Sequence, residues 1–174
     1  MLTDQQRDYL GQCTRRMQII AGTLASSVVV FGVVVLVMRQ GEPAESAVVS
    51  YVAIPYTIAC LVGSPIVAAR VARMAQQSLV QGTLKPPPNA PTGSSDVGLL
   101  AGVYQTRLII AAAIIEGAAF LNLVAYLLEG HVWTLAATVV LLFILLMQFP
   151  TTGRVENWVS DELESVQQLR GFSN

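Results

Sequence analysis

One carboxyl side chain, Glu116, stands in the middle of an otherwise uncharged apolar stretch at residues 108–128. If this stretch crosses a bilayer, a charge at that depth costs about 2.5–3.5 kcal/mol on insertion scales. Such a group normally faces protein or water and has a hydrogen-bonding partner. Glu116 is therefore the candidate intramembrane protonatable site of this chain.

Hydroxyl side chains at a similar depth in the two preceding apolar segments are the candidate partners of Glu116. Ser26 and Ser27 are the preferred partners, and Thr57 is a further candidate. A carboxyl that burial keeps protonated can donate a hydrogen bond to such a hydroxyl or accept one from it. Two roles follow for Glu116: a structural hydrogen bond that fixes helix packing, or a protonatable site that takes part in transport.

Small residues beside Glu116 predict close helix packing. Ala113 and Gly117 are four positions apart, the small-xxx-small spacing that lets another helix approach closely in a membrane. Asn122 lies on a different face from Glu116 and is expected to bond to a neighbouring helix.

The composition predicts that these residues are carried by membrane helices. Of the 174 residues, 53% are hydrophobic and only 12% are charged, which is too apolar for an ordinary soluble domain. Each apolar segment is close to the roughly 20 residues that a transmembrane helix needs, and none alternates in polarity as barrel strands do. The four segments are residues 17–38, 47–69, 108–128 and 132–149. The sequence therefore predicts an all-α fold, an integral membrane four-helix bundle made of two helical hairpins.

The basic residues predict the orientation of this bundle. Nine of the ten precede the first segment, lie between the second and third, or follow the fourth, and only Arg39 lies in a predicted outer loop. By the positive-inside rule, both termini and the middle loop are cytoplasmic, and the chain is expected in the cell inner membrane. The predicted parts are a cytoplasmic N-terminal segment (1–16), a first transmembrane hairpin (17–73), a cytoplasmic Pro/Gly/Ser-rich linker (74–98), a second transmembrane hairpin (99–150) and a cytoplasmic C-terminal segment (151–174).

The two hairpins show some internal similarity. At an offset of 91 residues, Arg16 matches Arg107 and Ile19 matches Ile110, and at an offset of 85 Pro65 matches Pro150. A duplication of one hairpin and a chance similarity between apolar helices both account for these matches.

A local resemblance adds to this interpretation. The residues that carry it are 104–107, 109–110 and 116–130, which include Glu116, Gly117 and Asn122. This pattern resembles small uncharacterised bacterial membrane proteins, a resemblance that implies no activity. Locally it is also similar to the carboxylate helix of rotary ATP synthase proteolipids. In that class the acid lies on the second helix of a hairpin whose loop faces the cytoplasm, whereas Glu116 is on the first helix of an outward-facing hairpin. No proton-translocating role is therefore carried over from it.

The sequence contains none of the motifs that are typical of soluble enzymes. The chain has no phosphate-binding glycine loop, no cluster with metal-ligand spacing and no basic patch typical of nucleic-acid binding. The lone histidine, His131, is expected to be a solvated surface residue of the outer turn. We therefore expect no enzyme activity, cofactor, metal or nucleic-acid partner.

The expected protein is non-catalytic, packs in the lipid bilayer and associates with itself or a membrane partner. The alternative is a proton- or small-cation-coupled transport component that uses Glu116.

Overall fold

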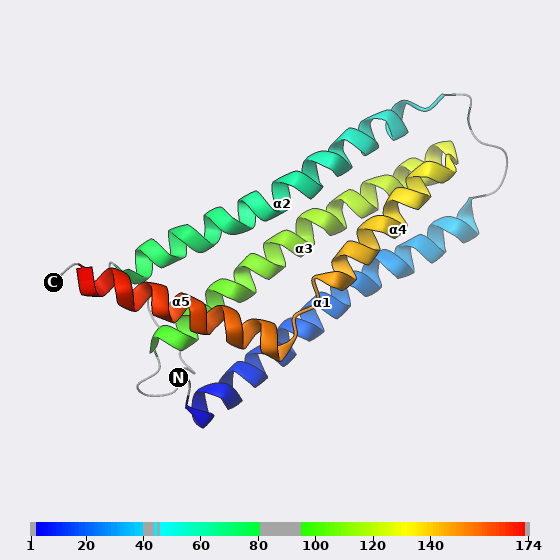
Figure 1. Ribbon diagram of the computed structural model, residues 1–174. Helices are drawn as coiled ribbons and strands as arrows, with labels where there is room; N and C mark the ends of the chain where they lie inside the picture. The colour runs from blue at the N-terminus through cyan, green and yellow to red at the C-terminus, as the bar shows by residue number, and fades with distance from the viewer. Residues whose placement is uncertain (1–2, 40–43, 45, 81–94, 173–174) are drawn as a thin grey trace. The chain divides into compact units, whose positions relative to one another are not determined.

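The protein is all-helical in the computed structural model, which describes residues 3–39, 44, 46–80 and 95–172. Five helices occur within these ranges, and no strand does (Figure 1). They are α1 (Asp4–Met38), α2 (Val48–Val80), α3 (Ser95–Glu129), α4 (Val132–Met147) and α5 (Thr152–Phe172). The predicted all-α class is confirmed, with one helix more than the four apolar segments.

The first three helices are longer than the apolar segments they contain. The polar residues before position 17 continue the same helix, and α1 starts at a capping box. There the Gln6 backbone N–H donates to Thr3 Oγ1 (3.4 Å), and the Thr3 N–H donates to Gln6 Oε1 (2.9 Å). Helices α2 and α3 likewise extend into the range 74–98 that was predicted as a linker, to Val80 and from Ser95. The proline-rich part of that linker, 81–94, lies outside the described residues.

Within the described ranges, three helices are long and apolar enough to cross a membrane: α1, α2 and α3. A fourth span is counted only if α4 and α5 are taken together as one bent pair, because α4 alone has 16 residues. Many large apolar side chains are exposed in the chain, as lipid-facing residues of a membrane protein would be; they include Val30, Val37, Val52, Val62, Val139 and Phe143. These features fit a membrane protein with three to four spans.

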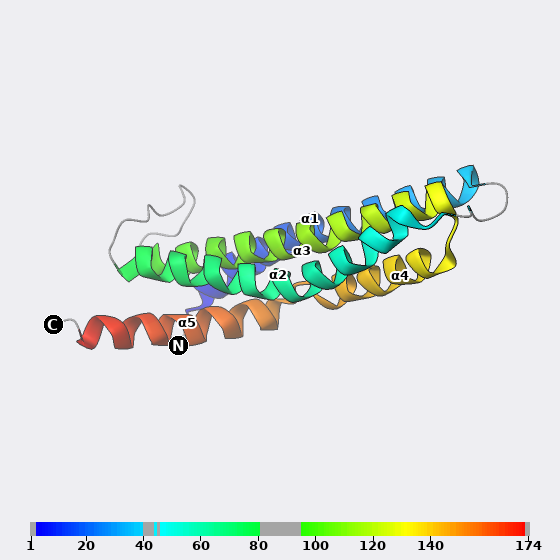
Figure 2. The same cartoon turned by 90° about the horizontal axis from the view of Figure 1, so that it is seen from above.

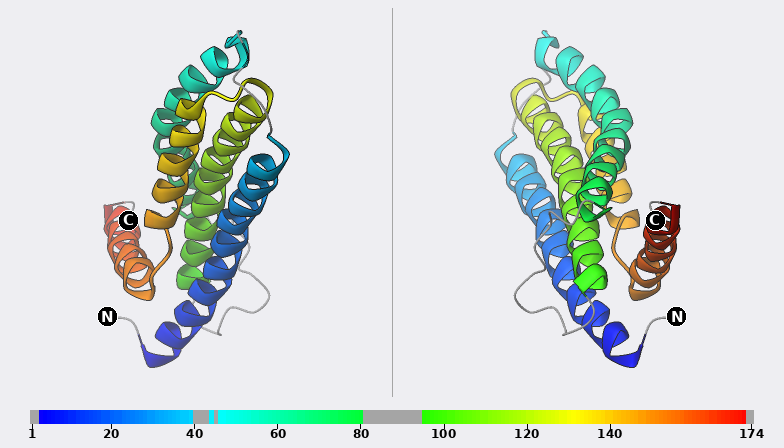
Figure 3. Two further views of the ribbon diagram at one scale, coloured as in Figure 1. Left: turned by 90° about the vertical axis from the view of Figure 1, so that its right-hand side faces the viewer. Right: turned by 90° about the vertical axis from the view of Figure 1, so that its left-hand side faces the viewer.

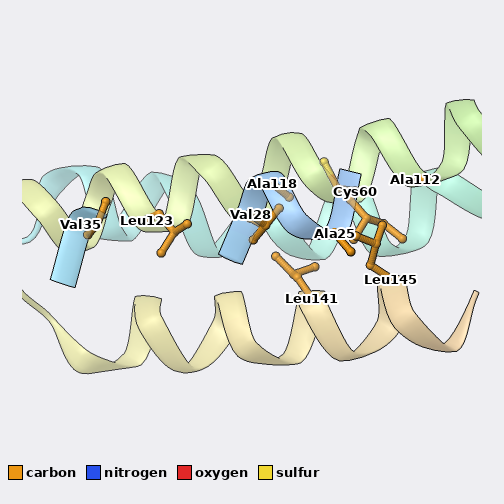
Figure 4. Close-up of a cluster of buried hydrophobic side chains, with 11 residues drawn as sticks. Ala25, Val28, Val35, Cys60, Ala112, Ala118, Leu123, Leu141 and Leu145 are labelled. Carbon is orange, nitrogen blue, oxygen red and sulfur yellow. The ribbon is translucent and has the colours of Figure 1, made fainter. Parts of the chain in front are cut away.

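The helices contribute to two compact units, and each unit combines parts of both predicted hairpins. Unit 2 comprises Ile20–Val67 and Ile109–Phe149. In it, successive stretches of α1, α2, α3 and α4 run side by side in alternating directions (Figure 2, Figure 3). Their inward faces form one apolar cluster, in which Leu141 and Leu145 of α4 point toward small residues such as Ala25 and Ala112 (Figure 4).

Unit 1 comprises Met1–Ile19, Ala68–Leu108 and Pro150–Asn174. The core of unit 1 joins the first half of α1, the first half of α3 and α5, through residues such as Leu10, Leu100 and Val159. Helix α5 is amphipathic, and its Trp158 ring packs on Tyr104 with centroids 5.2 Å apart. Trp158 is thus half-buried against α3.

Candidate intramembrane site

Glu116 is hydrogen-bonded to Ser27, and both residues belong to unit 2. Ser27 Oγ of α1 lies 2.5 Å from Glu116 Oε1 of α3 and 2.6 Å from the carbonyl oxygen of Leu24, one turn earlier in its own helix. Both side chains are half-buried. The structure therefore brings one of the two preferred partners to Glu116.

The Ser27 hydroxyl has two acceptors within reach, the Leu24 carbonyl and the Glu116 carboxyl. The Ser27 hydroxyl is placed to donate to either oxygen, but it carries only one hydrogen and can also accept. The Leu24 carbonyl can only accept. Both contacts are satisfied at once when Ser27 donates to Leu24 and the O–H of a neutral Glu116 donates to Ser27. An ionised Glu116 would leave one hydrogen for two acceptors.

The surroundings of Glu116 differ on its two sides. On one side, the buried residues Ala112, Ala119 and Leu123 belong to the apolar cluster of unit 2. One turn further along α3, Phe120 packs edge to face on Phe31 with ring centroids 5.3 Å apart. On the other side, the two predicted helix-packing residues, Ala113 and Gly117, are both exposed, so within unit 2 this small face of α3 is left uncovered.

The other candidate partners lie elsewhere. Ser26 is exposed on α1, and the structure shows no bond between it and Glu116. Thr57 is buried on α2, where its hydroxyl donates to the Ala53 carbonyl (2.8 Å) and accepts from Asn122 Nδ2 (2.6 Å). Thr57 therefore partners Asn122, which lies on a different face of α3 from Glu116.

The Asn122 amide has only one orientation that satisfies its neighbours. Its Nδ2 donates to Thr57 Oγ1 and to the Ala118 carbonyl (2.8 Å). Thr57 already donates its hydrogen to Ala53 and the carbonyl can only accept, so turning the amide round would place acceptor against acceptor. Asn122 is fully buried, and its Oδ1 has no hydrogen-bond partner among the described residues. The expected hydrogen bond from Asn122 to a neighbouring helix is therefore present, and the acceptor left unpaired is Oδ1 of the same side chain.

A second carboxyl, Glu129, is a structural residue that the sequence interpretation missed. It lies at the end of α3, is 5% exposed, and receives hydrogen bonds at the start of α2. Glu129 Oε1 accepts from the Val49 N–H (2.6 Å), and Oε2 accepts from the N–H (2.8 Å) and hydroxyl (2.5 Å) of Ser50. Such donors, together with the positive end of the helix dipole, stabilise an ionised carboxylate. No local signal in the sequence pointed to this role, because Glu42 and Glu45 lie closer to the start of α2 along the chain.

The turn that follows Glu129 is also closely packed. Gly130 has a φ of 75°, and a Cβ atom built on it would lie 1.9 Å from Nη2 of Arg39. The neighbouring His131 is half-buried rather than solvated as expected, and its ring packs edge to face on Trp133. Its Nε2 is buried without a partner among the described residues. The turn at residues 129–131, which the sequence predicted to be solvated, is thus buried or half-buried.

No family model, no curated protein and no solved structure matches this chain. Within the ranges that the structure describes, no group of three or more His, Cys, Asp or Glu side chains is arranged to hold a metal ion.

Proposed function

We propose that the chain is a non-catalytic, multi-pass protein of the cell inner membrane that acts through helix packing and association with a membrane partner. In this proposal the four apolar segments form a transmembrane four-helix bundle, and the positive-inside distribution of Lys and Arg puts both termini in the cytoplasm. The observation that carries the proposal is the Glu116–Ser27 contact.

This contact supports a packing role because the carboxyl is committed to a neighbouring helix. A neutral Glu116 that donates to Ser27, with Ser27 donating to Leu24, uses every hydrogen of the group. A neutral carboxyl also avoids the cost of a charge in the bilayer. In this arrangement the bond joins α1 to α3 and needs no change of protonation.

The uncovered small face of α3 supports the association part of the proposal. Ala113 and Gly117 are exposed at the level of Glu116, and a Cβ built on Gly117 meets no atom within 4 Å. Small residues in such positions allow another transmembrane helix to approach closely. The partner is a second copy of the chain or a different membrane protein.

The alternative function is a proton- or small-cation-coupled transport component. One observation favours it: Glu116 is half-buried rather than fully enclosed, and the exposed Ala113 and Gly117 flank it. A carboxyl with an open side could exchange a proton with a partner or with water.

Proton flux into vesicles distinguishes the two functions. We expect vesicles that contain the wild-type protein to take up protons, under an imposed potential, no faster than vesicles that contain Glu116→Gln. The glutamine keeps a donor for Ser27, so this variant should fold with the same helical content, which circular dichroism checks. A wild-type flux that is about ten-fold or more above that of Glu116→Gln would favour transport, because removing a proton-transfer group typically costs at least that much.

A further inference from the structure

The second carboxyl oxygen of Glu116 is left without a partner. Ser27 contacts Oε1 of this carboxyl, and among the described residues no donor contacts Oε2. Oε2 is also not enclosed by the chain, so it reaches the surface of unit 2, where the flanking Ala113 and Gly117 are exposed too. The hydrocarbon core of a bilayer offers no water to such an oxygen, and an unpaired acceptor there is costly. The site is therefore incomplete in a single copy of the chain.

The hydroxyl of Ser26 is a matching donor in the same unit. Ser26 is exposed on α1 and directly precedes Ser27, so it lies at the depth of Glu116. Within the described part of the chain, its hydroxyl makes no hydrogen bond. Hydroxyls elsewhere on the helices of unit 2 donate within the unit; they include those of Ser50, Thr57, Thr134 and Thr138. Ser26 is thus a free donor at the level of a free acceptor.

Donor and acceptor lie on the same side of the α1–α3 pair. Ser27 and Glu116 mark the line along which the two helices meet. Ser26 is one residue before this line on α1, and Gly117 is one residue after it on α3, a rotation of about 100° in each case. Because α1 and α3 run in the same direction, a step back on one helix and a step forward on the other turn toward the same side (Figure 2). The exposed Ser26 and Gly117 therefore share one face of unit 2.

We propose that a second copy of the chain covers this face, with Ser26 of each copy donating to Glu116 Oε2 of the other. A two-fold axis along the bilayer normal makes both bonds at once, because donor and acceptor lie at one depth in the same unit. The small Ala113 and Gly117 let the helix of the second copy approach closely. A neutral Glu116 then gives its O–H to Ser27 and accepts at Oε2, so that both of its oxygens are bonded.

A second copy fits this face better than an unrelated helix, because the chain already carries the donor that the site lacks. The inference rests on the proposed function, since it names the partner of the same site.

Förster energy transfer between copies in phosphatidylcholine vesicles tests the inference. Copies that carry a donor or an acceptor dye at the amino terminus are mixed, and the dimer Kd is obtained from the transfer at increasing lipid-to-protein ratios. We expect the wild type to dimerise and Ser26→Ala to raise the Kd about ten-fold, because two hydrogen bonds are lost per dimer and each contributes about three-fold. Ser26→Thr keeps the hydroxyl and should dimerise within about two-fold of the wild type.

A matched pair of glycine variants tests the face itself. Gly117→Leu fills the face and should weaken the dimer by about ten-fold or more, whereas Gly63→Leu on α2 should stay within about two-fold of the wild type. At both glycines a Cβ meets no atom within 4 Å, so neither side chain disturbs the packing within one copy, and circular dichroism checks that both variants fold.

The inference is wrong if the wild type stays monomeric, if Ser26→Ala dimerises as strongly as the wild type, or if Gly63→Leu weakens the dimer as much as Gly117→Leu. None of these results touches the Glu116–Ser27 bond within one copy, which forms without the second copy. The proposed function fails on a different result, a proton flux that depends on Glu116.

Discussion

Replacing Glu129 with alanine is expected to lower the free energy of unfolding by about 3 kcal/mol, a large effect for a single side chain. The substitution leaves the N–H groups of Val49 and Ser50 and the Ser50 hydroxyl without their acceptor in a buried place. It also removes a negative charge from the start of α2, where such a charge stabilises the helix. Thermal unfolding in detergent, followed by circular dichroism, should show a fall in Tm of about 6–12 °C.

Two further variants test whether the hydrogen bonds cause this effect. Glu129→Gln keeps one acceptor oxygen, which can still accept from both donors of Ser50, but presents an amide donor to the Val49 N–H, so it should lose roughly half as much stability. Glu164→Ala removes an exposed carboxyl of α5 and should change the unfolding free energy by less than about 0.5 kcal/mol. Equal stability of Glu129→Ala and the wild type would show that this carboxyl does not hold the start of α2.

Replacing Gly130 with valine is expected to destabilise the protein by about 2–4 kcal/mol. Its φ of 75° lies in the left-handed region, which costs an L-residue roughly 1–2 kcal/mol and a β-branched one more. The new side chain would also overlap the guanidinium group of Arg39, which then has to move. The same thermal measurement applies to this variant.

The matched control for Gly130 is a glycine with helical backbone angles and open space around its Cα atom. Gly63 lies within α2, and a Cβ built on it meets no atom within 4 Å. Gly63→Ala should therefore leave the stability unchanged or raise it by up to about 1 kcal/mol, since alanine is the better helix former. If Gly130→Val were as stable as Gly63→Ala, the turn after α3 would not be constrained as described.

The helical class and the apolar segments could be predicted because they depend on local composition. A run of apolar residues such as 17–38 predicts a helix by its length and hydropathy alone. The extent of the helices could not be predicted in this way. The polar start of α1 and the ends of α2 and α3 near the linker are helical, and α5 buries Val155 and Val159 against other helices of unit 1. Tertiary packing of an amphipathic face stabilises such segments more than local propensity does.

The candidate site was predictable only in part, for a related physical reason. Depth along straight helices placed Ser27 at the level of Glu116, because the rise per residue of a helix is fixed. Depth does not say which face of a helix turns toward a neighbour, so Ser26 and Ser27 were equally preferred and Thr57 was a further candidate. The contacts of Glu129 join residues 80 positions apart along the chain, and no local pattern encodes such a pairing. Its role follows only once the ends of α2 and α3 are brought together.

We propose that the hydrogen bond between Glu116 and Ser27 packs α1 against α3 and that Glu116 is neutral in this role. Infrared difference spectroscopy of the protein in lipid, comparing wild type with Glu116→Gln, measures the protonation of this one group directly. For this packing role we expect a carboxylic acid band that is absent in Glu116→Gln and stays constant between about pH 5 and 9. The band should shift in Ser27→Ala because the hydrogen-bond partner is lost. A band that titrates within this range would place Glu116 in exchange with water and contradict the packing role in favour of transport.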